Sequence, residues 1–438
     1  MKKFVITTLG CKVNQCESEA IAHYLKDAGW AVSQDGETAD LCIINTCTVT
    51  HKASMQSRQA VRQAVRTHPG AKVIVTGCYA QTEPEVLRKI EGIDCVVGHS
   101  DKHRIPDIAR NGSEAGHDAP SVICRDIGEE RVFRQMPAIA YGSRTRPVLK
   151  IQDGCNAFCT YCIVPYARGR SRSMPVADVL NHLRQLKKAG YREAVLSGIH
   201  VGCYGKDLTP KTDFATLLRH IRDGELIDRV RISSVEPHEL NDDIIETVAG
   251  SDRFCDHFHI PLQSGDDGIL KQMHRPYSRD FFRELVMKIH QQAPDAAIGV
   301  DTLIGFPGED EAAFENTRRL IEELPVTYLH VFPFSPREGT PAFSYPNPVR
   351  PEVAKARCGK MRTLGQQKRR AFYDRFVGKT VPVLVEGRRD KQTGLLRGVS
   401  SNYLNVLMEG DDRFQNTVLQ AEIGAVRDDT SALGRIVT

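Results

Sequence analysis

The chain carries, over residues 155–162, the run Cys155-Asn156-Ala157-Phe158-Cys159-Thr160-Tyr161-Cys162, which sets three thiols at the spacing C-x3-C-x2-C. Thiolates are soft ligands, and iron–sulfur clusters prefer them. Three cysteines can hold three irons of a 4Fe–4S cluster and leave the fourth iron open for a cosubstrate. A zinc knuckle is the alternative, but no His or fourth Cys follows at ligand distance. The spacing therefore predicts a cluster with an open iron.

The residues around this run alternate between apolar strand patterns and helical patterns. The strand candidates are Val148–Gln152, Glu193–Ser197, Val230–Val235, His257–Ile260, Ala297–Ile304 and Thr327–Phe332. Repeated βα units of this kind predict a parallel sheet curved into a partial barrel, with function at the carboxyl ends of the strands. The cysteine run follows the first strand directly, as that rule requires.

The first region of the chain, to about residue 135, alternates in the same way. Its predicted strands are Phe4–Thr8, Leu41–Asn45 and Val73–Thr76, and its predicted helices are Ser18–Lys26 and Ser54–Arg66. Such alternation predicts a second parallel sheet made of βαβ units. Residues 98–144 are rich in His, Asp, Gly and charge, and we expect them to add one or two edge elements and a linker.

The last region begins with a basic helical pattern over Glu352–Arg375 and then turns to short strands. The strand patterns are Val381–Val385, Leu395–Val399, Tyr403–Met408, Thr417–Ala421 and Gly434–Val437. They predict a small closed β-barrel, a shape that often binds nucleic acid. The expected fold class is therefore α/β with a C-terminal β-barrel, and the expected domains are 1–135, 140–372 and 375–438.

The composition is that of an intracellular enzyme. The chain has 438 residues, 41% of them hydrophobic, which suffices for large cores. Its 13 cysteines are an odd number without the regular framework of a small secreted domain, so a reducing cytoplasm is the better account. The apolar stretch near Met1 is too short and too interrupted by threonine for export, and no run reaches transmembrane length. We expect a cytoplasmic protein with no membrane partner.

Three further cysteines in the first region share one context. Cys11, Cys47 and Cys78 each come shortly after an apolar strand. Because the carboxyl ends of neighbouring parallel strands lie at one sheet edge, these sulfurs can converge and form a second cluster site. The alternative is that they are buried core thiols, as we expect for Cys42 and Cys95 inside strand patterns. The pattern alone leaves both interpretations open.

The motifs around the cysteines resemble those of the radical S-adenosylmethionine (SAM) methylthiotransferases. The resemblance lies in Gly10-Cys11-Lys12-Val13-Asn14-Gln15, Asn45-Thr46-Cys47-Thr48-Val49-Thr50, Thr76-Gly77-Cys78 and the run of Cys155, Cys159 and Cys162. The C-terminal barrel resembles a TRAM domain. The resemblance implies an auxiliary 4Fe–4S cluster on the first three cysteines and a second, SAM-binding 4Fe–4S cluster on the last three.

The same resemblance implies contacts to SAM near the strand ends. The residues concerned are Tyr161, Ser197, Gly198, Ser234, Glu236 and Gly305. Ordinary roles are the alternatives: a core aromatic for Tyr161, a salt-bridged carboxylate for Glu236 and a turn former for Gly305.

Within the family, the motifs at Cys11 and Cys47 look like the branch acting on tRNA that bears N6-threonylcarbamoyladenosine. The reaction implied adds a methylthio group to C2 of that adenosine, beside the anticodon, with SAM as both methyl donor and radical source. The alternatives are the branches for isopentenyladenosine in tRNA or for an aspartate of a ribosomal protein, and an RNA-binding iron–sulfur electron carrier or sensor. An electron donor such as flavodoxin or ferredoxin and a sulfur source are further implied partners.

Basic side chains gather in two places suited to RNA phosphates. Arg168, Arg170 and Arg172 follow the cysteine run, and we expect them to face the anionic threonylcarbamoyl group. The barrel region contributes Arg388, Arg389 and Lys391. The net charge of +4 proves nothing by itself, and solvated faces balanced by acids are the alternative.

Overall fold

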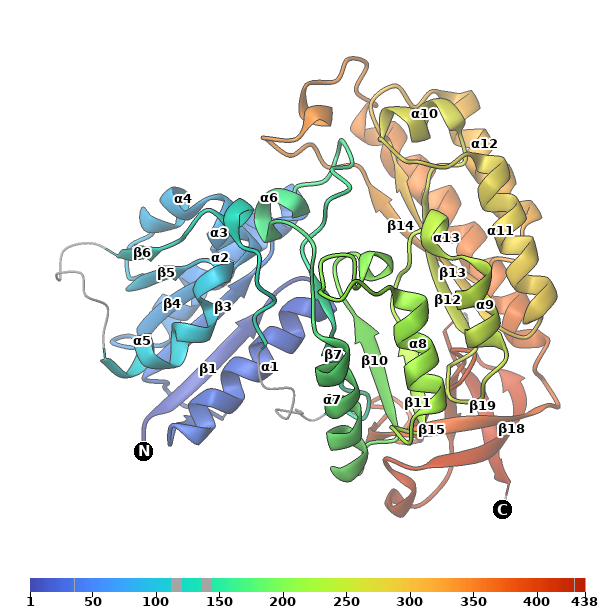
Figure 1. Cartoon of the computed structure of the whole chain (residues 1–438), viewed down its shortest axis with the longest axis horizontal. Coiled ribbons are helices and arrows are strands. Elements are labelled where there is room, and N and C mark those ends of the chain that lie inside the picture. The colour runs from blue at the N-terminus through green and yellow to red at the C-terminus, as the bar shows by residue number, and fades with distance from the viewer. Residues whose placement is uncertain (35, 112–119, 136–143, 429, 438) are drawn as a thin grey trace. The chain divides into compact units, whose positions relative to one another are not determined.

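The computed structural model describes residues 1–437 except 35, 112–119, 136–143 and 429, and the chain forms two compact units (Figure 1). Unit 1 comprises residues 1–142, 150–174 and 335–343, and unit 2 comprises residues 143–149, 175–334 and 344–438. The predicted domain start at residue 140 lies outside the described residues. Among the helices in the described part of the chain, none is long and apolar enough to cross a membrane.

Unit 1 is built on a parallel sheet with the strand order β2-β1-β3-β4-β5-β6. The strands are β1 (Lys3–Thr8), β2 (Ala31–Val32), β3 (Leu41–Thr46), β4 (Lys72–Gly77), β5 (Cys95–Val97) and β6 (Ser121–Ile123). The three predicted strands are confirmed, and β6 is the edge element expected between residues 98 and 144.

Helices cover both faces of this sheet, which is why its central strands are apolar on both sides. They are α1 (Lys12–Asp27), α2 (His51–Thr67), α3 (Cys78–Thr82), α4 (Pro84–Arg88) and α5 (Ile105–Asn111). Leu41 and Ile43 pack in the core on the side of α1, while Cys42 and Ile44 pack in the core on the side of α2. Cys42 and Cys95 are buried core thiols, as predicted.

Two elements near the cysteines differ from the prediction. Helix α1 begins at Lys12 rather than Ser18, because its first turns bury two polar side chains, Asn14 and Glu17, that interrupt the apolar pattern. The predicted strand Val148–Gln152 is divided into β7 (Val148–Lys150) and β8 (Gln152–Asp153). Strand β8 pairs with β9 (Arg172–Ser173) in the antiparallel sense and closes the base of the loop that carries Cys155, Cys159 and Cys162.

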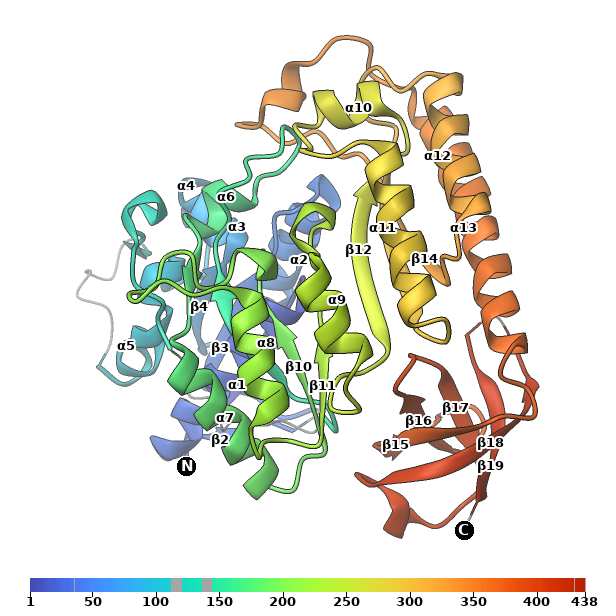
Figure 2. The same ribbon diagram turned by 45° about the vertical axis from the view of Figure 1, so that its right-hand side comes forward.

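Unit 2 contains two three-stranded sheets, β11-β10-β7 and β12-β13-β14. Their further strands are β10 (Glu193–Ser197), β11 (Arg229–Ile232), β12 (His257–Gln263), β13 (Ala297–Ile304) and β14 (Tyr328–Pro333). A main-chain hydrogen bond from Val235 N to His259 O, 3.0 Å long, joins one sheet to the other. Together the strands form the curved βα array that the sequence predicts (Figure 2).

Helices alternate with these strands along the chain. They are α7 (Val176–Lys188), α8 (Phe214–Asp223), α9 (Asp242–Ala249), α10 (Asp267–Gln272), α11 (Arg279–Gln292) and α12 (Glu311–Glu323). The basic helix α13 (Pro351–Asp374) follows β14 and leads into the last part of the chain (Figure 2).

The C-terminal residues form the predicted closed barrel, with the strand order β15-β16-β17-β19-β18. The strands are β15 (Thr380–Arg389), β16 (Leu396–Ser400), β17 (Asn405–Met408), β18 (Val418–Val426) and β19 (Ala432–Val437). Phe372 and Tyr373 of α13 belong to the barrel core, so the helix and the barrel share one apolar interior.

A buried carboxylate ties the barrel to the sheet of unit 2. Glu193 on β10 is fully buried and accepts hydrogen bonds from Arg231 Nε at 2.9 Å and Arg229 Nε at 3.0 Å. Arg231 also donates to the main-chain oxygens of Ser400 and Ser401, each at 3.0 Å. Burial opposes the charge of Glu193, but Arg231 and Arg229 outweigh it and lower the pKa of the carboxyl to about 2.

Replacing this carboxylate is expected to destabilise the protein, because Glu193→Gln leaves two buried guanidinium groups uncompensated. We expect a loss of about 3–5 kcal/mol in the free energy of unfolding, measured by urea denaturation at pH 7. Since the folded pKa lies below the unfolded one, the Glu193 contribution is complete above about pH 5. It should fade as the pH falls towards about 2. The exposed Glu246→Gln is the control, and an equal loss in both variants would contradict this role for Glu193.

Candidate functional site

The sheet edge at the ends of β1, β3 and β4 brings Cys11, Cys47 and Cys78 together. Adjacent strands are in parallel register there. A Cβ on Gly10 would lie 3.0 Å from Cys47 Sγ, and Cys78 interacts electrostatically with both other thiols. Gly10 and Gly77 have φ values of +97° and +102°, which turn the chain sharply at the sheet edge. The thiols therefore converge as the strand order predicts, and their binding of a cluster stays a prediction.

Two of these thiols are buried. Cys47 is 7% exposed and Cys78 is 5% exposed. Burial and, to a smaller extent, the neighbouring cysteines raise the pKa of the Cys78 thiol to about 11, although Arg168 and Lys102 act to lower it. Burial also raises the pKa of Cys47. Thiolates at this place require positive charge beside them.

Arg168 is at the centre of a buried ionic network that supplies this charge. Its Nη1 lies 3.0 Å from Glu17 Oε1 and 2.8 Å from Asp153 Oδ1, and its Nη2 donates to Asn14 Oδ1 at 2.6 Å. The side chain is 1% exposed. The contacts join α1, which starts next to Cys11, to the short helix α6 (Val164–Arg168) that follows the cysteine loop.

Two lysines complete the network. Lys150 Nζ lies 3.1 Å from a carboxylate oxygen of both Glu17 and Asp153, and Lys102 contacts the other oxygen of Glu17. Burial would raise the pKa of Glu17, but Arg168, Lys102 and Lys150 hold it well below its usual value. The network thus holds three buried cations, Arg168, Lys102 and Lys150, against two buried carboxylates, Glu17 and Asp153. Arg168 also interacts electrostatically with Cys78 and Cys11. This excess positive charge beside converging thiols fits an anionic iron–sulfur cluster.

The second set of cysteines lies in a tightly closed loop. Cys155 N donates to Gly169 O at 3.0 Å, and Cys162 N donates to Cys159 O at 2.9 Å. Gly154 opens the loop with a φ of +73°, and a Cβ there would lie 2.0 Å from a main-chain oxygen of the returning segment. Glycine alone allows this approach, so the closed loop depends on it.

The residues implied for SAM contact in unit 2 lie at the carboxyl ends of strands. Ser197 is the last residue of β10 and Gly198 follows it. Ser234 and Glu236 come after β11, and Gly305 comes after β13 with a φ of +84°. Their positions agree with the rule for parallel βα folds, and their binding of SAM stays a prediction.

Some of these candidates already have protein partners. Glu236 forms an ion pair with Arg275, so the salt-bridged alternative is present in the structure. Gly305 N donates to Glu309 Oε1 at 3.0 Å. Tyr161, in unit 1, is partly exposed between two of the loop cysteines.

A hydrogen-bonded chain behind Ser234 was not predicted. Ser234 Oγ lies 2.7 Å from His259 Nδ1, and His259 Nε2 lies 2.8 Å from Asp301 Oδ1. His330 Nδ1 lies 3.1 Å from the same oxygen. Burial would raise the pKa of Asp301, but hydrogen bonds from the two imidazoles hold it well below its usual value. With His259 neutral, the ionised Asp301 holds the imidazole proton on Nε2, so Ser234 donates to Nδ1 and keeps its oxygen lone pairs for another group.

The three arginines after the cysteine loop do not form one surface, which corrects the expectation that they all face a substrate. Arg168 is enclosed in the ionic network, and Arg172 is 5% exposed and donates to the main-chain oxygens of Arg168 and Arg170, each at 2.9 Å. We assign both a structural role. Arg170 is exposed and stays the substrate candidate.

The basic residues of the barrel also differ from one another. Arg388 and Lys391 are exposed. Arg389 lies 2.8 Å from Asp412 Oδ1 and donates to the main-chain oxygens of Gly394 and Gly410 at 2.9 Å and 2.8 Å. Arg389 therefore links the two barrel loops that contain Gly394 and Gly410.

Comparison with known proteins agrees with this fold. Residues 3–98 match the family described as uncharacterized protein family UPF0004, and residues 149–321 match the radical SAM superfamily. The solved radical S-adenosylmethionine methyltransferase TsrM from Kitasatospora setae has a TM-score of 0.58 and 16% identity over 78% of this chain and 77% of its own. The shared fold and the three-cysteine loop define a radical SAM protein.

Relatives that match nearly the whole chain show which family of radical SAM proteins it resembles. The chain is 38% identical, over 95% of its length and 92% of the relative, to the threonylcarbamoyladenosine tRNA methylthiotransferase MtaB of Bacillus subtilis. It is 34% identical to the protein of the same name from Aquifex aeolicus, over 93% of this chain and 97% of that one. It is 35% identical to the tRNA-2-methylthio-N(6)-dimethylallyladenosine synthase of Clostridium tetani, over 90% and 88%. The chain belongs to the radical SAM methylthiotransferase family, whose cofactors are SAM and two 4Fe–4S clusters.

The two sets of thiols are expected to account for all of the bound iron. Anaerobically reconstituted protein should carry about eight irons, and changing Cys155, Cys159 and Cys162 together to Ala should leave about four, as counted by iron and sulfide analysis. The buried core variant Cys42→Ala is the control and should keep all of the iron. Full iron in the triple variant would show that these cysteines are not ligands.

Removing the guanidinium of Arg168 is expected to destabilise unit 1 and to lower its iron content. Arg168→Met leaves Glu17 and Asp153 with fewer buried cations, so the free energy of unfolding should fall by about 3 kcal/mol or more. Iron content should also fall, since Arg168 is next to Cys11 and Cys78. Arg170→Met, at an exposed position two residues away, should change neither quantity. Equal stability and iron in the two variants would refute the structural role.

Proposed function

We propose that this protein transfers a methylthio group to C2 of N6-threonylcarbamoyladenosine, just 3′ of the anticodon of tRNA. The observation that carries the proposal is the presence of two three-thiol sets in unit 1, one of them at a sheet edge beside excess buried positive charge. A single SAM-binding cluster would need only the loop of Cys155, Cys159 and Cys162.

The substrate is supported by the names of relatives that match nearly the whole chain. Those from Bacillus subtilis and Aquifex aeolicus are named for threonylcarbamoyladenosine tRNA. The motif Cys11-Lys12-Val13-Asn14 points to the same branch. The relative from Clostridium tetani, named for dimethylallyladenosine, makes the dimethylallyl (isopentenyl) substrate the second candidate.

When bound, the two clusters and SAM supply the methyl group and the radical chemistry that an unactivated ring C–H bond requires. The residues of the chain hold and orient these groups. Cys11, Cys47 and Cys78 would hold the auxiliary cluster, with Arg168 and Lys102 compensating its negative charge. The closed loop would hold the other cluster through its three cysteines. Ser234, fixed by His259 and Asp301, would offer its oxygen to SAM.

Exposed cationic side chains are our candidates for the contacts with RNA. An adenosine in the anticodon loop is single-stranded, so its base can be unstacked into a pocket at modest cost. Arg170 is our candidate for the threonylcarbamoyl carboxylate, and Arg388 and Lys391 are our candidates for phosphates. Flavodoxin or ferredoxin as electron donor, and a sulfur source, are the further partners we propose, and a tRNA substrate implies action in the cytoplasm.

The decisive experiment supplies reconstituted enzyme, SAM and a reductant with tRNA of each type. We expect mass spectrometry of the digested nucleosides to show the 2-methylthio derivative of threonylcarbamoyladenosine and none of the dimethylallyl nucleoside. Methylation and sulfur transfer to the dimethylallyl nucleoside alone would overturn the substrate while leaving the reaction class. Cleavage of SAM without modification of either tRNA would favour the ribosomal-protein branch, and absence of SAM cleavage would favour an electron carrier.

A further inference from the structure

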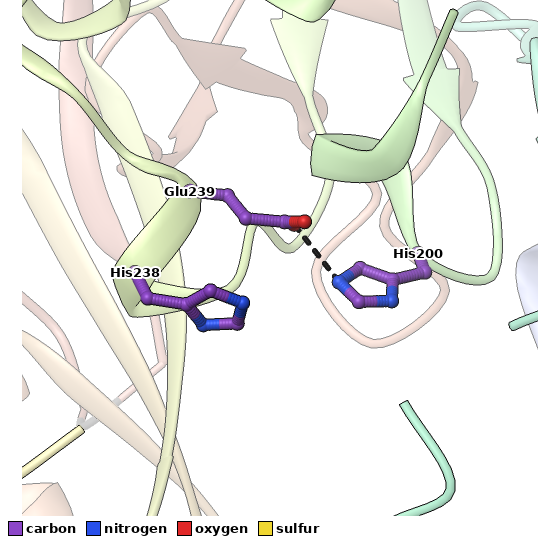
Figure 3. Close-up of side chains that lie close together, drawn as sticks. All are labelled: His200, His238 and Glu239. Carbon is purple, nitrogen blue, oxygen red and sulfur yellow. Dashed lines mark ion pairs between the residues drawn. The ribbon is translucent and has the colours of Figure 1, made fainter. Parts of the chain in front are cut away.

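The loops after β10 and β11 of unit 2 bring two imidazoles and a carboxylate into one group. His200 follows β10, and His238 and Glu239 follow β11 in the 3-10 turn Pro237–Glu239. One nitrogen of each imidazole and one carboxylate oxygen all lie within 4.8 Å of one another. Figure 3 shows the Glu239 carboxylate directed at the His200 ring, with the His238 ring beside it.

Glu239 is held firmly in this group. Its Oε2 lies 2.8 Å from His200 Nε2, and its Oε1 accepts hydrogen bonds from Cys203 Sγ at 3.1 Å and Lys206 Nζ at 3.2 Å. A Cβ on Gly202 would lie 2.0 Å from Glu239 Oε2, so the loop after β10 closes onto the carboxylate. The side chain of Glu239 is 7% exposed. Two loops that are distant in sequence thus meet at one carboxylate.

Cys203 orients the His200 ring. Its sulfur lies 3.6 Å from His200 Nδ1, and its proton goes to Glu239 Oε1. With the His200 proton on Nδ1, this sulfur is its acceptor and the lone pair of Nε2 faces Glu239 Oε2; with the proton on Nε2, the imidazole donates to that oxygen. Two lone pairs at 2.8 Å repel each other unless a proton or a metal ion lies at them. A histidine that ligates a metal through one nitrogen and donates through the other has this arrangement.

The second imidazole, that of His238, favours a metal ion over a proton between His200 and Glu239. A simple imidazolium–carboxylate pair requires only His200 and Glu239. His238 adds a third ligand atom on the residue next to Glu239, and its ring is stacked on Tyr277 at 6.4 Å with an angle of 23° between the planes. Two imidazoles and one carboxylate are a donor set that zinc prefers.

We propose that His200, His238 and Glu239 bind one divalent transition-metal ion of the zinc class, which fixes the loop after β10 to the turn after β11. The ligand atoms belong to unit 2 and are separate from the six cysteines assigned to iron. Lys206, whose side chain is 61% exposed, can move into solvent as the cation binds.

The other group of this composition in the described residues does not support the same inference. In His259, Asp301 and His330, the oxygen Asp301 Oδ1 accepts from both imidazoles, and Ser234 occupies the remaining nitrogen of His259. Hydrogen bonds satisfy those groups without a metal ion.

The test uses the full-length protein with both clusters reconstituted, incubated with zinc alone and then freed of unbound metal. We expect about one zinc ion per chain in the unsubstituted protein and in His290→Gln, whose imidazole lies on α11 outside the group. His238→Gln and Glu239→Gln should lower the zinc affinity at least tenfold in competition with a chromophoric chelator, with iron content unchanged. Because His238 is exposed, its variant is expected to fold.

Zinc X-ray absorption then separates this site from adventitious binding at cysteines. A shell of nitrogen and oxygen ligands that is lost in His238→Gln supports the proposal. Sulfur ligands, no zinc retained by the unsubstituted protein, or equal zinc in the unsubstituted and Glu239→Gln proteins would each overturn it.

Discussion

The buried ion cluster around Arg168 is the constraint on which unit 1 depends. Taking charged groups out of water costs several kcal/mol for each ion, and only close oppositely charged partners offset that cost. Glu17 comes from α1, Lys102 from the turn after β5, Asp153 from β8 and Arg168 from α6. A shift of any one of these segments would leave a buried charge without a partner. The cluster therefore fixes α1, and with it the first thiol, against the base of the cysteine loop.

The elements of the fold were predictable because apolar periodicity reports burial directly. The alternation of Leu41, Cys42, Ile43 and Ile44 between two cores is that of a strand covered on both faces, and the structure confirms it. The convergence of Cys11, Cys47 and Cys78 was predictable for a topological reason, since parallel strands end at one edge. These predictions needed only the order of strands and helices.

The ionic partners were not predictable in this way. Arg168, Arg170 and Arg172 look alike in the sequence, yet the first and third are buried and the second is exposed. What distinguishes Arg168 is Glu17, which belongs to another region of the chain, and no local pattern reports such a pair. Likewise, His200 with Glu239 and His259 with Asp301 are similar in composition. Both pairs have a second imidazole beside them, and only the geometry shows that His330 and Ser234 form hydrogen bonds with the second pair.

The charge that organises unit 1 also bears on its chemistry. Burial favours the protonated form of Cys78, whose pKa is raised to about 11, and a metal cluster binds the thiolate. Ligation at Cys78 must therefore release a proton into a poorly solvated place, which nearby cations make easier. Arg168 and Lys102 both interact electrostatically with Cys78, and Cys11 is at the N-terminus of α1, where the helix dipole favours negative charge. Glu17 and Asp153 carry two negative charges against the three positive charges of Arg168, Lys102 and Lys150, so positive charge is left for the thiolates. The same guanidinium that fixes the segments of unit 1 thus makes thiolate ligation at the sheet edge electrostatically favourable.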